Sequence, residues 1–323
     1  MVTISDVASY CGVNESTVSR VLNNSSKISR ETTERVKEAV KILGYKPVRK
    51  RIKKKAPRNI TFVIPNTALY TLGGTLKEFS ATLHDTDYEI HIFNLHQRRD
   101  VDVELAELLC KKDTAGLILY GCIIPEDAAK VFYANNMPVV AEQSHTSHLV
   151  SYCVNNYNGI RDAVNYVVSR GYRRIGFIGW KPEDFNIRER YNSYKNVMEE
   201  HDLERDMIYF GPQLDMMGGY EATDHLWEMY KPEVLVFAAD ILAYGGIKYL
   251  KEQGISYPND IGLIGFDDAY PSELLGLTSM YQLLDENAHL VMESLMDMIK
   301  NKTVHPAKEV LLTPKLIRRD SLK

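Results

Sequence analysis

The sequence has 323 residues, more than one compact core usually holds, so we expect a small unit and a larger body. Its 45% hydrophobic content is ordinary for a globular protein, and no run of about 18 apolar residues predicts a membrane span. The N-terminus lacks the basic and apolar regions of a signal peptide, which favours a cytoplasmic protein.

The net charge of −4 conceals an uneven distribution. Residues 1–58 hold 14 Lys or Arg and 5 Asp or Glu, which gives +9, whereas the rest of the chain carries −13. A basic head on an acidic body indicates a polyanionic partner for the head. A basic tail that is merely solvated would give the same charge, so charge alone does not decide.

Cysteine and histidine spacing predicts neither a disulfide framework nor a metal site, and no cofactor is expected. The four cysteines form no CxxC pair and are interpreted as buried free thiols. Only His145 and His148 form a close histidine pair, in a polar stretch without a partner at a recognisable spacing. We favour a solvated loop there over a metal site.

Three short helices are predicted at the N-terminus. Thr3 and Asp6 are typical of a helix N-cap, and Gly12 ends this first helix. Asn14 begins a second helix, and the third runs from near Ser29 to Gly44. Two short helices joined by a glycine-containing turn form a helix-turn-helix unit, and the apolar faces of the three helices can make one small core.

The second helix carries polar side chains opposite its apolar face. Arg20 can donate two hydrogen bonds to a guanine, Glu15 can accept from a cytosine, and Ser16 lies beside them. Short polar side chains nearby are suited to phosphate oxygens. These predicted phosphate contacts are Thr3, Asn14, Thr17, Asn23, Ser29 and Thr32.

Residues 3–8 and 12–23 read T-I-S-D-V-A and G-V-N-E-S-T-V-S-R-V-L-N, and L-G-Y-K-P follows at residues 43–47. This pattern closely resembles the N-terminal signature of the lactose/galactose-repressor family of bacterial transcriptional regulators. The resemblance implies that residues 1–46 are a helix-turn-helix DNA-binding domain. It also implies that Glu15, Ser16 and Arg20 read the bases.

A basic linker is predicted at residues 47–58, because residues 48–58 hold seven Lys or Arg and little apolar surface. Such a segment should be disordered or weakly helical away from DNA. In the resembling family it forms a hinge helix that wedges a leucine into the minor groove. Here the hinge is about two residues shorter and lysine stands at the leucine position, which leaves Ile52 as the wedge and Arg51 and Lys54 as groove contacts. A flexible tether without groove contacts is the alternative.

Residues 59–323 alternate short apolar runs with amphipathic stretches, which predicts an α/β fold. So many units favour two Rossmann-like lobes of the periplasmic-binding-protein-like type over one wide sheet, with a ligand cleft between them. The predicted strands are 60–64, 89–93, 116–120, 138–141, 175–179, 234–238 and 261–265, and the predicted helices are 76–83, 103–110, 160–170, 190–200, 222–229 and 242–251.

Two rival functions are weighed against a regulator: a solute-binding protein and a sugar-acting enzyme, each with a basic appendage. The missing export signal counts against the first. Against the second, the sequence contains no GxGxxG after the first strand, no GxxxxGK[ST] and no GxSxG, and no partner acid or base accompanies Asp267 and Asp268 at a readable spacing. We therefore expect no enzymatic activity.

The resemblance continues through the body, in R-E-R-Y-N-S-Y at 188–194, G-F-D-D at 265–268 and L-I-R-R-D-S at 316–321. It implies that Arg190 and Asp267 contact an effector, a pairing of guanidinium and carboxylate that can hold hydroxyl groups. Asp240 is a further contact or a helix cap. Gln143 replaces an aspartate of the family, and Trp180 is either a stacking surface, in place of an aromatic lost at Leu214, or a structural side chain.

The resemblance further implies a homodimer on pseudo-palindromic operator DNA. In this interpretation a small molecule in the cleft, a sugar or sugar derivative, changes operator affinity, and the chain represses a carbohydrate-utilisation operon. Relief of repression by an inducer is the leading version, and co-repression uses the same parts. The chain ends without leucine heptads, which favours a dimer over a tetramer.

Overall fold

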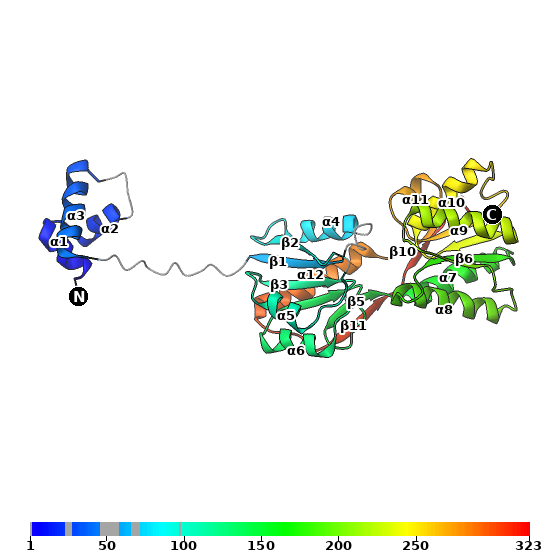
Figure 1. Ribbon diagram of the computed structural model, residues 1–323, viewed down its shortest axis with the longest axis horizontal. Helices are drawn as coiled ribbons and strands as arrows, with labels where there is room; N and C mark the ends of the chain where they lie inside the picture. The colour runs from blue at the N-terminus through cyan, green and yellow to red at the C-terminus, as the bar shows by residue number, and fades with distance from the viewer. Residues whose placement is uncertain (1, 23–27, 46–57, 66–71, 97) are drawn as a thin grey trace. The chain divides into compact units, whose positions relative to one another are not determined.

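The computed structural model describes residues 2–22, 28–45, 58–65, 72–96 and 98–323 (Figure 1). The chain divides into two compact units, Met1–Ala56 and Pro57–Lys323. Within the described residues, no helix is long and apolar enough to cross a membrane. The predicted hinge contacts Arg51, Ile52 and Lys54 and the predicted phosphate contact Asn23 lie outside the described residues.

The first unit contains helices α1 (Ile4–Cys11), α2 (Glu15–Leu22) and α3 (Arg30–Leu43). The predicted cap of α1 is confirmed, because the Thr3 hydroxyl accepts from the Asp6 amide while the Asp6 carboxylate accepts from the Thr3 amide. The helix ends at a left-handed glycine, as predicted. Apolar side chains of all three helices form one core, whose buried members are Val7, Ala8, Cys11, Val18, Val21, Val36 and Ala39.

The second unit has two lobes, each built on a six-stranded sheet covered by helices on both faces (Figure 1). The first sheet is parallel throughout and has the order β11-β5-β4-β3-β1-β2. Helices α4 and α12 pack on one face, and α5 and α6 pack on the other. The elements of this first lobe are β1 (Asn59–Ile64), α4 (Leu72–Leu83), β2 (Glu89–Asn94), α5 (Val103–Cys110), β3 (Gly116–Tyr120), α6 (Glu126–Ala134), β4 (Val139–Glu142), β5 (Val150–Val154), α12 (Leu284–Asn301) and β11 (Lys308–Leu312).

The second lobe repeats this plan with the sheet order β12-β10-β9-β8-β6-β7, in which only β12 is antiparallel to its neighbour. Helices α7 and α8 cover one face, and α9 and α10 cover the other (Figure 1). Its elements are α7 (Asn156–Ser169), β6 (Ile175–Trp180), α8 (Phe185–Glu200), β7 (Ile208–Gly211), α9 (Met216–Tyr230), β8 (Val234–Phe237), α10 (Asp240–Glu252), β9 (Gly262–Asp267), α11 (Pro271–Leu274), β10 (Thr278–Tyr281) and β12 (Lys315–Ile317). The predicted pair of Rossmann-like lobes is therefore confirmed.

The chain passes between the lobes three times. It leaves the first lobe after β5, returns after β10 to form α12 and β11, and leaves again to form β12. Since β5 and β11 are neighbours in one sheet, two of these crossings start from the same sheet edge. Side chains at the ends of these strands therefore lie close to both lobes.

The sequence prediction placed the first residue of several helices too late in the chain. Helix α8 was predicted from Arg190 but begins at Phe185, where the Asp184 carboxylate accepts from the amides of Asn186 and Ile187. Helix α9 likewise begins at Met216, after the N-cap Asp215. The error arises because the first turns of these helices are polar, whereas the prediction relied on the spacing of apolar residues. Elements that the prediction omitted are α6, α11, α12, β5, β7, β10, β11 and β12.

Glycines allow helices α9 and α10 to approach each other closely. A Cβ added to Gly245 would lie 1.9 Å from the Met216 carbonyl oxygen, and one added to Gly219 would lie 2.0 Å from that of Leu242. Both obstacles are backbone atoms, so a rotamer change cannot relieve the overlap. The two helices would have to move apart.

Gly245→Ala should therefore destabilise the protein by about 1–3 kcal/mol or more, because the added methyl group overpacks the helix interface. Urea denaturation measures the loss. Gly74→Ala in α4 is the matched control, since its Cβ would meet only the Leu284 side chain at 3.8 Å. It should be neutral or stabilising by up to about 1 kcal/mol. Equal stability of the two variants would contradict the close approach.

Candidate DNA interface and effector site

Helix α2 presents an exposed polar face. Glu15, Ser16 and Arg20 are exposed, while Val18 and Val21 on the opposite side are buried in the core of the first unit. Among the described residues, no hydrogen bond or ion pair engages the Arg20 guanidinium. The three predicted base-reading side chains thus share one accessible helix face.

The predicted phosphate contacts differ in their exposure and in whether their hydroxyls already have hydrogen-bond partners. Asn14 is exposed and Thr17 half-buried. The hydroxyls of Thr3 and Ser29 already cap helices α1 and α3, and Ser29 Oγ lies 2.9 Å from Thr32 Oγ1. These hydroxyls retain acceptor lone pairs, but their own hydrogens have partners within the chain, so a phosphate would have to compete for them.

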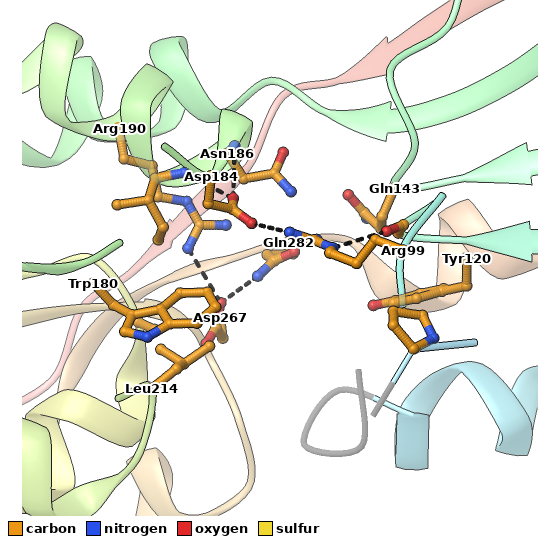
Figure 2. Close-up of a pocket in the computed structure, with 14 residues that line it drawn as sticks. Arg99, Tyr120, Gln143, Trp180, Asp184, Asn186, Arg190, Leu214, Asp267 and Gln282 are labelled. Atoms are coloured by element: carbon orange, nitrogen blue, oxygen red, sulfur yellow. Dashed lines mark hydrogen bonds and ion pairs between the residues drawn. The ribbon is translucent and has the colours of Figure 1, made fainter. Parts of the chain in front are cut away.

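A cavity of about 120 Å³ lies between the two lobes (Figure 2). It is smaller than the roughly 300–1,000 Å³ of usual ligand pockets, so a ligand of ordinary size requires the lobes to separate. Many of its side chains stand at or just after the carboxyl ends of parallel strands, the predicted place for a site. The lining residues are Pro65, Arg99, Tyr120, Gly121, Gln143, Trp180, Asp184, Asn186, Ile187, Arg190, Leu214, Ala239, Asp267 and Gln282.

The guanidinium of Arg190 is buried in the second lobe. Its Nε donates to Asn156 Oδ1 at 2.7 Å, and Nη1 donates to the Ala238 carbonyl. The guanidinium carbon lies 3.7 Å from the centre of the Phe266 ring, a cation–π contact. Burial lowers the pKa of Arg190 and the Asp267 charge opposes that shift. These contacts fix the side chain before any ligand binds.

Asp267 ends strand β9 and faces Arg190, with 3.8 Å between its Oδ1 and Arg190 Nη1 (Figure 2). The same Oδ1 accepts from Gln282 Nε2, and Oδ2 accepts from the Asp240 amide, the first of helix α10, at 3.3 Å. Burial raises the pKa of Asp267 to about 7, against the opposing effect of Arg190.

Asp240 does not line the cavity. Its side chain is fully buried, and its carboxylate accepts hydrogen bonds from Ser272 Oγ, from Ser279 Oγ at 2.7 Å and from the Ala269 amide at 3.1 Å. The N-cap of α10 is Ala239, so Asp240 does not cap its helix either. Both suggested roles give way to a structural one, because Asp240 joins the loop after β9 to strand β10.

Gln143 and Trp180 both line the cavity, from opposite lobes (Figure 2). Gln143 Oε1 accepts from the Val154 amide at 3.4 Å, whereas its Nε2 is buried and has no partner among the described residues. Trp180 is 7% exposed and donates from Nε1 to the Pro212 carbonyl at 3.3 Å. Gln143 therefore offers a free donor, and Trp180 offers a ring that is held in place.

Sequence reasoning missed an ion pair that joins the lobes. Arg99, from the segment after β2, pairs through Nη1 with Asp184 Oδ2 at the start of α8 (Figure 2). Its Nε also donates to the Gly121 carbonyl at 3.3 Å. The cap position before α8 was a usable signal for Asp184, but nothing in the local sequence marks Arg99. Since Arg99 pairs with Asp184 and Arg190 faces Asp267, the cavity charges balance and suit a neutral, polar ligand.

Comparison with known proteins agrees with both units. The model of bacterial regulatory proteins of the lacI family matches residues 3–48, and that of the periplasmic binding protein-like domain matches residues 164–322. The HTH-type transcriptional repressor CytR of Escherichia coli (strain K12) is 27% identical over 88% of this chain and 89% of its own. The repressor PurR of Actinobacillus pleuropneumoniae serotype 3 (strain JL03) is 24% identical over 100% of this chain and 99% of its own.

Solved structures share the whole fold. A lacI-family transcriptional regulator from Silicibacter pomeroyi has a TM-score of 0.71 at 26% identity and covers all of both chains. The lac repressor dimer bound to operator and the anti-inducer ONPF has a TM-score of 0.71 at 23% identity, over 100% of this chain and 99% of that one. Signature, domain order and fold therefore all agree with those of the lacI family of bacterial regulatory proteins, to which the chain is similar along its length.

Proposed function

We propose that this protein is a repressor that binds a pseudo-palindromic operator as a homodimer and that a small polar effector between the lobes controls this binding. One observation carries the proposal. The same chain combines a basic N-terminal segment, in which α2 has an exposed polar face, with a second unit whose two lobes both line one cavity. The positive and negative side chains of that cavity balance. The named relatives are transcriptional repressors, and one matched structure is a lac repressor dimer bound to operator, which supports the DNA and dimer parts.

For the head, we propose that α2 enters the major groove, where Glu15, Ser16 and Arg20 meet the base edges. Asn14 and Thr17 contact phosphates together with the remaining short polar side chains predicted above. The linker residues Arg51, Ile52 and Lys54 are proposed to contact the minor groove between the half-sites. Positive charge over residues 1–58 supplies the attraction to DNA that does not depend on sequence.

For the body, we propose a carbohydrate or carbohydrate derivative as the effector and a carbohydrate-utilisation operon as the target. Arg190, Asp267, Gln143 and Trp180 supply fixed donors, acceptors and a ring for a hydroxylated molecule. A regulator that resembles this chain in fold was solved with cellobiose and another with ribose, which supports this class of ligand. A ligand that prefers one arrangement of the lobes shifts operator affinity by a coupling of about 1–3 kcal/mol.

A binding experiment tests the proposal directly. The operator is first selected from a random-sequence DNA pool with the full chain, and affinity is then measured over a salt series. Specific binding with a steep negative slope of log affinity against log salt is expected. A thermal-shift screen of sugars, sugar phosphates and nucleobases identifies the effector, because a ligand of the native state raises the melting temperature. Sequence-indifferent binding would rule out the regulator.

Arg20→Ala should weaken binding to the selected operator by about 1–3 kcal/mol and relax sequence preference at one position of each half-site. The control is Lys37→Ala, which removes the same charge from an exposed position on α3. It should lower affinity for all sequences equally, if at all. An Arg20→Ala variant that keeps the full preference of the native protein would show that α2 does not read the bases.

A further inference from the structure

Three potential metal ligands from two distant parts of the chain meet at the edge of the first sheet. Cys153 lies on β5, Glu309 lies on the neighbouring strand β11, and His145 lies in the segment between β4 and β5. Glu309 is in register with Ser151, so its side chain and that of Cys153 share one face of the strand pair, two residues apart. One ligand atom from each of the three residues lies within 4.8 Å of the others.

The set of donors suits one class of ion. Imidazole nitrogen, thiolate sulfur and carboxylate oxygen together are ligands of Zn²⁺ and of similar borderline divalent cations, with bonds of about 2.0–2.3 Å. Such bonds at tetrahedral angles place ligand atoms roughly 3.3–3.8 Å apart. His145 Nδ1 and Glu309 Oε1 lie 2.9 Å apart. Small side-chain rotations therefore suffice to admit an ion, and a fourth position stays open to water.

The surroundings favour a cation. The side chains of Glu309 and Glu142 are close enough to Cys153 to act on its sulfur electrostatically. A divalent ion that displaces the thiol proton to solvent would bind the resulting thiolate and offset the negative charge of Glu309. His145 already pairs through Nδ1 with Glu309, while its Nε2 is buried without a partner among the described residues.

An ion can reach this place from solvent. His145 and Glu309 line a surface depression whose other walls include Phe185 and Lys308. The Phe185 ring belongs to α8 of the second lobe and lies 4.2 Å from the His145 ring, measured between centroids. This depression is separate from the effector cavity, with which it shares no lining residue.

We propose that His145, Cys153 and Glu309 form a binding site for one Zn²⁺ or a similar borderline divalent cation, beside the strands that lead from the first lobe to the second. The sequence prediction considered only His145 with His148 and found no metal site. His148 is not a member of the cluster, and Glu309 is 164 residues away from His145 along the chain.

Cobalt and zinc titrations of the full-length protein test the site. The wild type should bind one Co²⁺ per chain with a sulfur-to-cobalt charge-transfer band in the near ultraviolet, and Zn²⁺ should displace it. Cys153→Ser should abolish the band. Glu309→Gln, a partly exposed position at which the fold should tolerate the change, should weaken affinity by more than the about 10- to 100-fold typical of lost outer-shell contacts.

The matched control is Cys122→Ser, because Cys122 is also buried in the first lobe but lies outside the cluster. It should bind Co²⁺ like the wild type and keep the band. A Zn²⁺-dependent rise in melting temperature, lost in Glu309→Gln and reversed by a chelator, gives a second readout. The proposal is overturned by the absence of one-to-one binding, by a band that survives in Cys153→Ser, or by unchanged affinity in Glu309→Gln.

Discussion

Glu142→Gln should make the protein more stable than the wild type at pH 8–9, with little difference between the two at pH 4–5. Glu142 is the last residue of β4, and its side chain is fully buried. Neither carboxylate oxygen has a hydrogen-bond partner among the described residues. Burial alone raises the pKa of this carboxyl group from 4.5 to about 8. The uncharged amide of glutamine avoids the cost of a buried charge.

The direction follows from proton linkage. The folded state holds the Glu142 proton more tightly than the unfolded state, so this group stabilises the fold fully below about pH 4.5 and loses its contribution as the pH rises to about 8. Each pKa unit corresponds to about 1.4 kcal/mol, so the difference between variant and wild type should grow to several kcal/mol. Asp267, whose pKa is also raised, titrates in both proteins and cancels in the difference.

Urea denaturation at half-unit pH intervals measures the two stability curves. Glu104→Gln, at an exposed position on α5, serves as the control and should reproduce the wild-type curve. Parallel curves for Glu142→Gln and the wild type would show that water or another group reaches the Glu142 carboxylate. A curve for Glu142→Gln that lies below the wild type at every pH would instead assign that carboxylate a stabilising partner.

The head and the strand pattern were predictable because their signals are local. Thr3, Asp6 and Gly12 act within one helix turn of where they stand, so the caps of α1 follow from the sequence. Buried parallel strands such as β3 and β8 are short apolar runs, and their bounds were predicted to within a residue. Local chemistry determines these elements, so the sequence suffices.

Elements at the crossings between lobes were missed because their partners are remote. Strand β11 has two exposed charged residues, Lys308 and Glu309, and gains its place only by pairing with β5. Helix α12 follows strands β6 to β10 of the second lobe in the chain yet packs on the first lobe. Asp240 shows the same limit within a site, because the serines and amide that hold its carboxylate come from 29 to 39 residues downstream.

The residues of the candidate cavity likewise differ in how far they could be predicted. Arg190 and Asp267 were predicted from a family resemblance that fixes single positions, and both face the cavity. No motif in the sequence identifies Gln282 and Arg99, although their contacts hold Asp267 and Asp184 in place. Cavity residues that a family signature marks are thus easier to predict than the residues that orient them, since orientation depends on tertiary packing.

Arg190→Ala should abolish the effector-induced rise in melting temperature and destabilise the protein by about 3–5 kcal/mol, the usual cost of removing one partner of a buried ion pair. Its loss leaves the Asn156 side chain and the Ala238 carbonyl without their donors. Protonation of Asp267 reduces the stability loss at low pH, because its pKa, already raised by burial, rises further once the Arg190 charge that lowers it is gone. The ligand response does not recover, since the guanidinium donors are gone.

A double-variant cycle separates binding from stability. Asp267→Asn should also lose the thermal response to the effector, and Arg190→Met combined with Asp267→Asn should cost less stability than the two single changes added together, because no buried charge remains unpaired. The control is Arg161→Ala, which breaks the exposed pair with Glu200 at 2.8 Å. Exposed pairs contribute at most about 1 kcal/mol, so this variant should keep both its stability and its response. If Arg190→Ala responds to the effector as Arg161→Ala does, then the effector binds without touching the buried pair, and the cavity between the lobes is not its site.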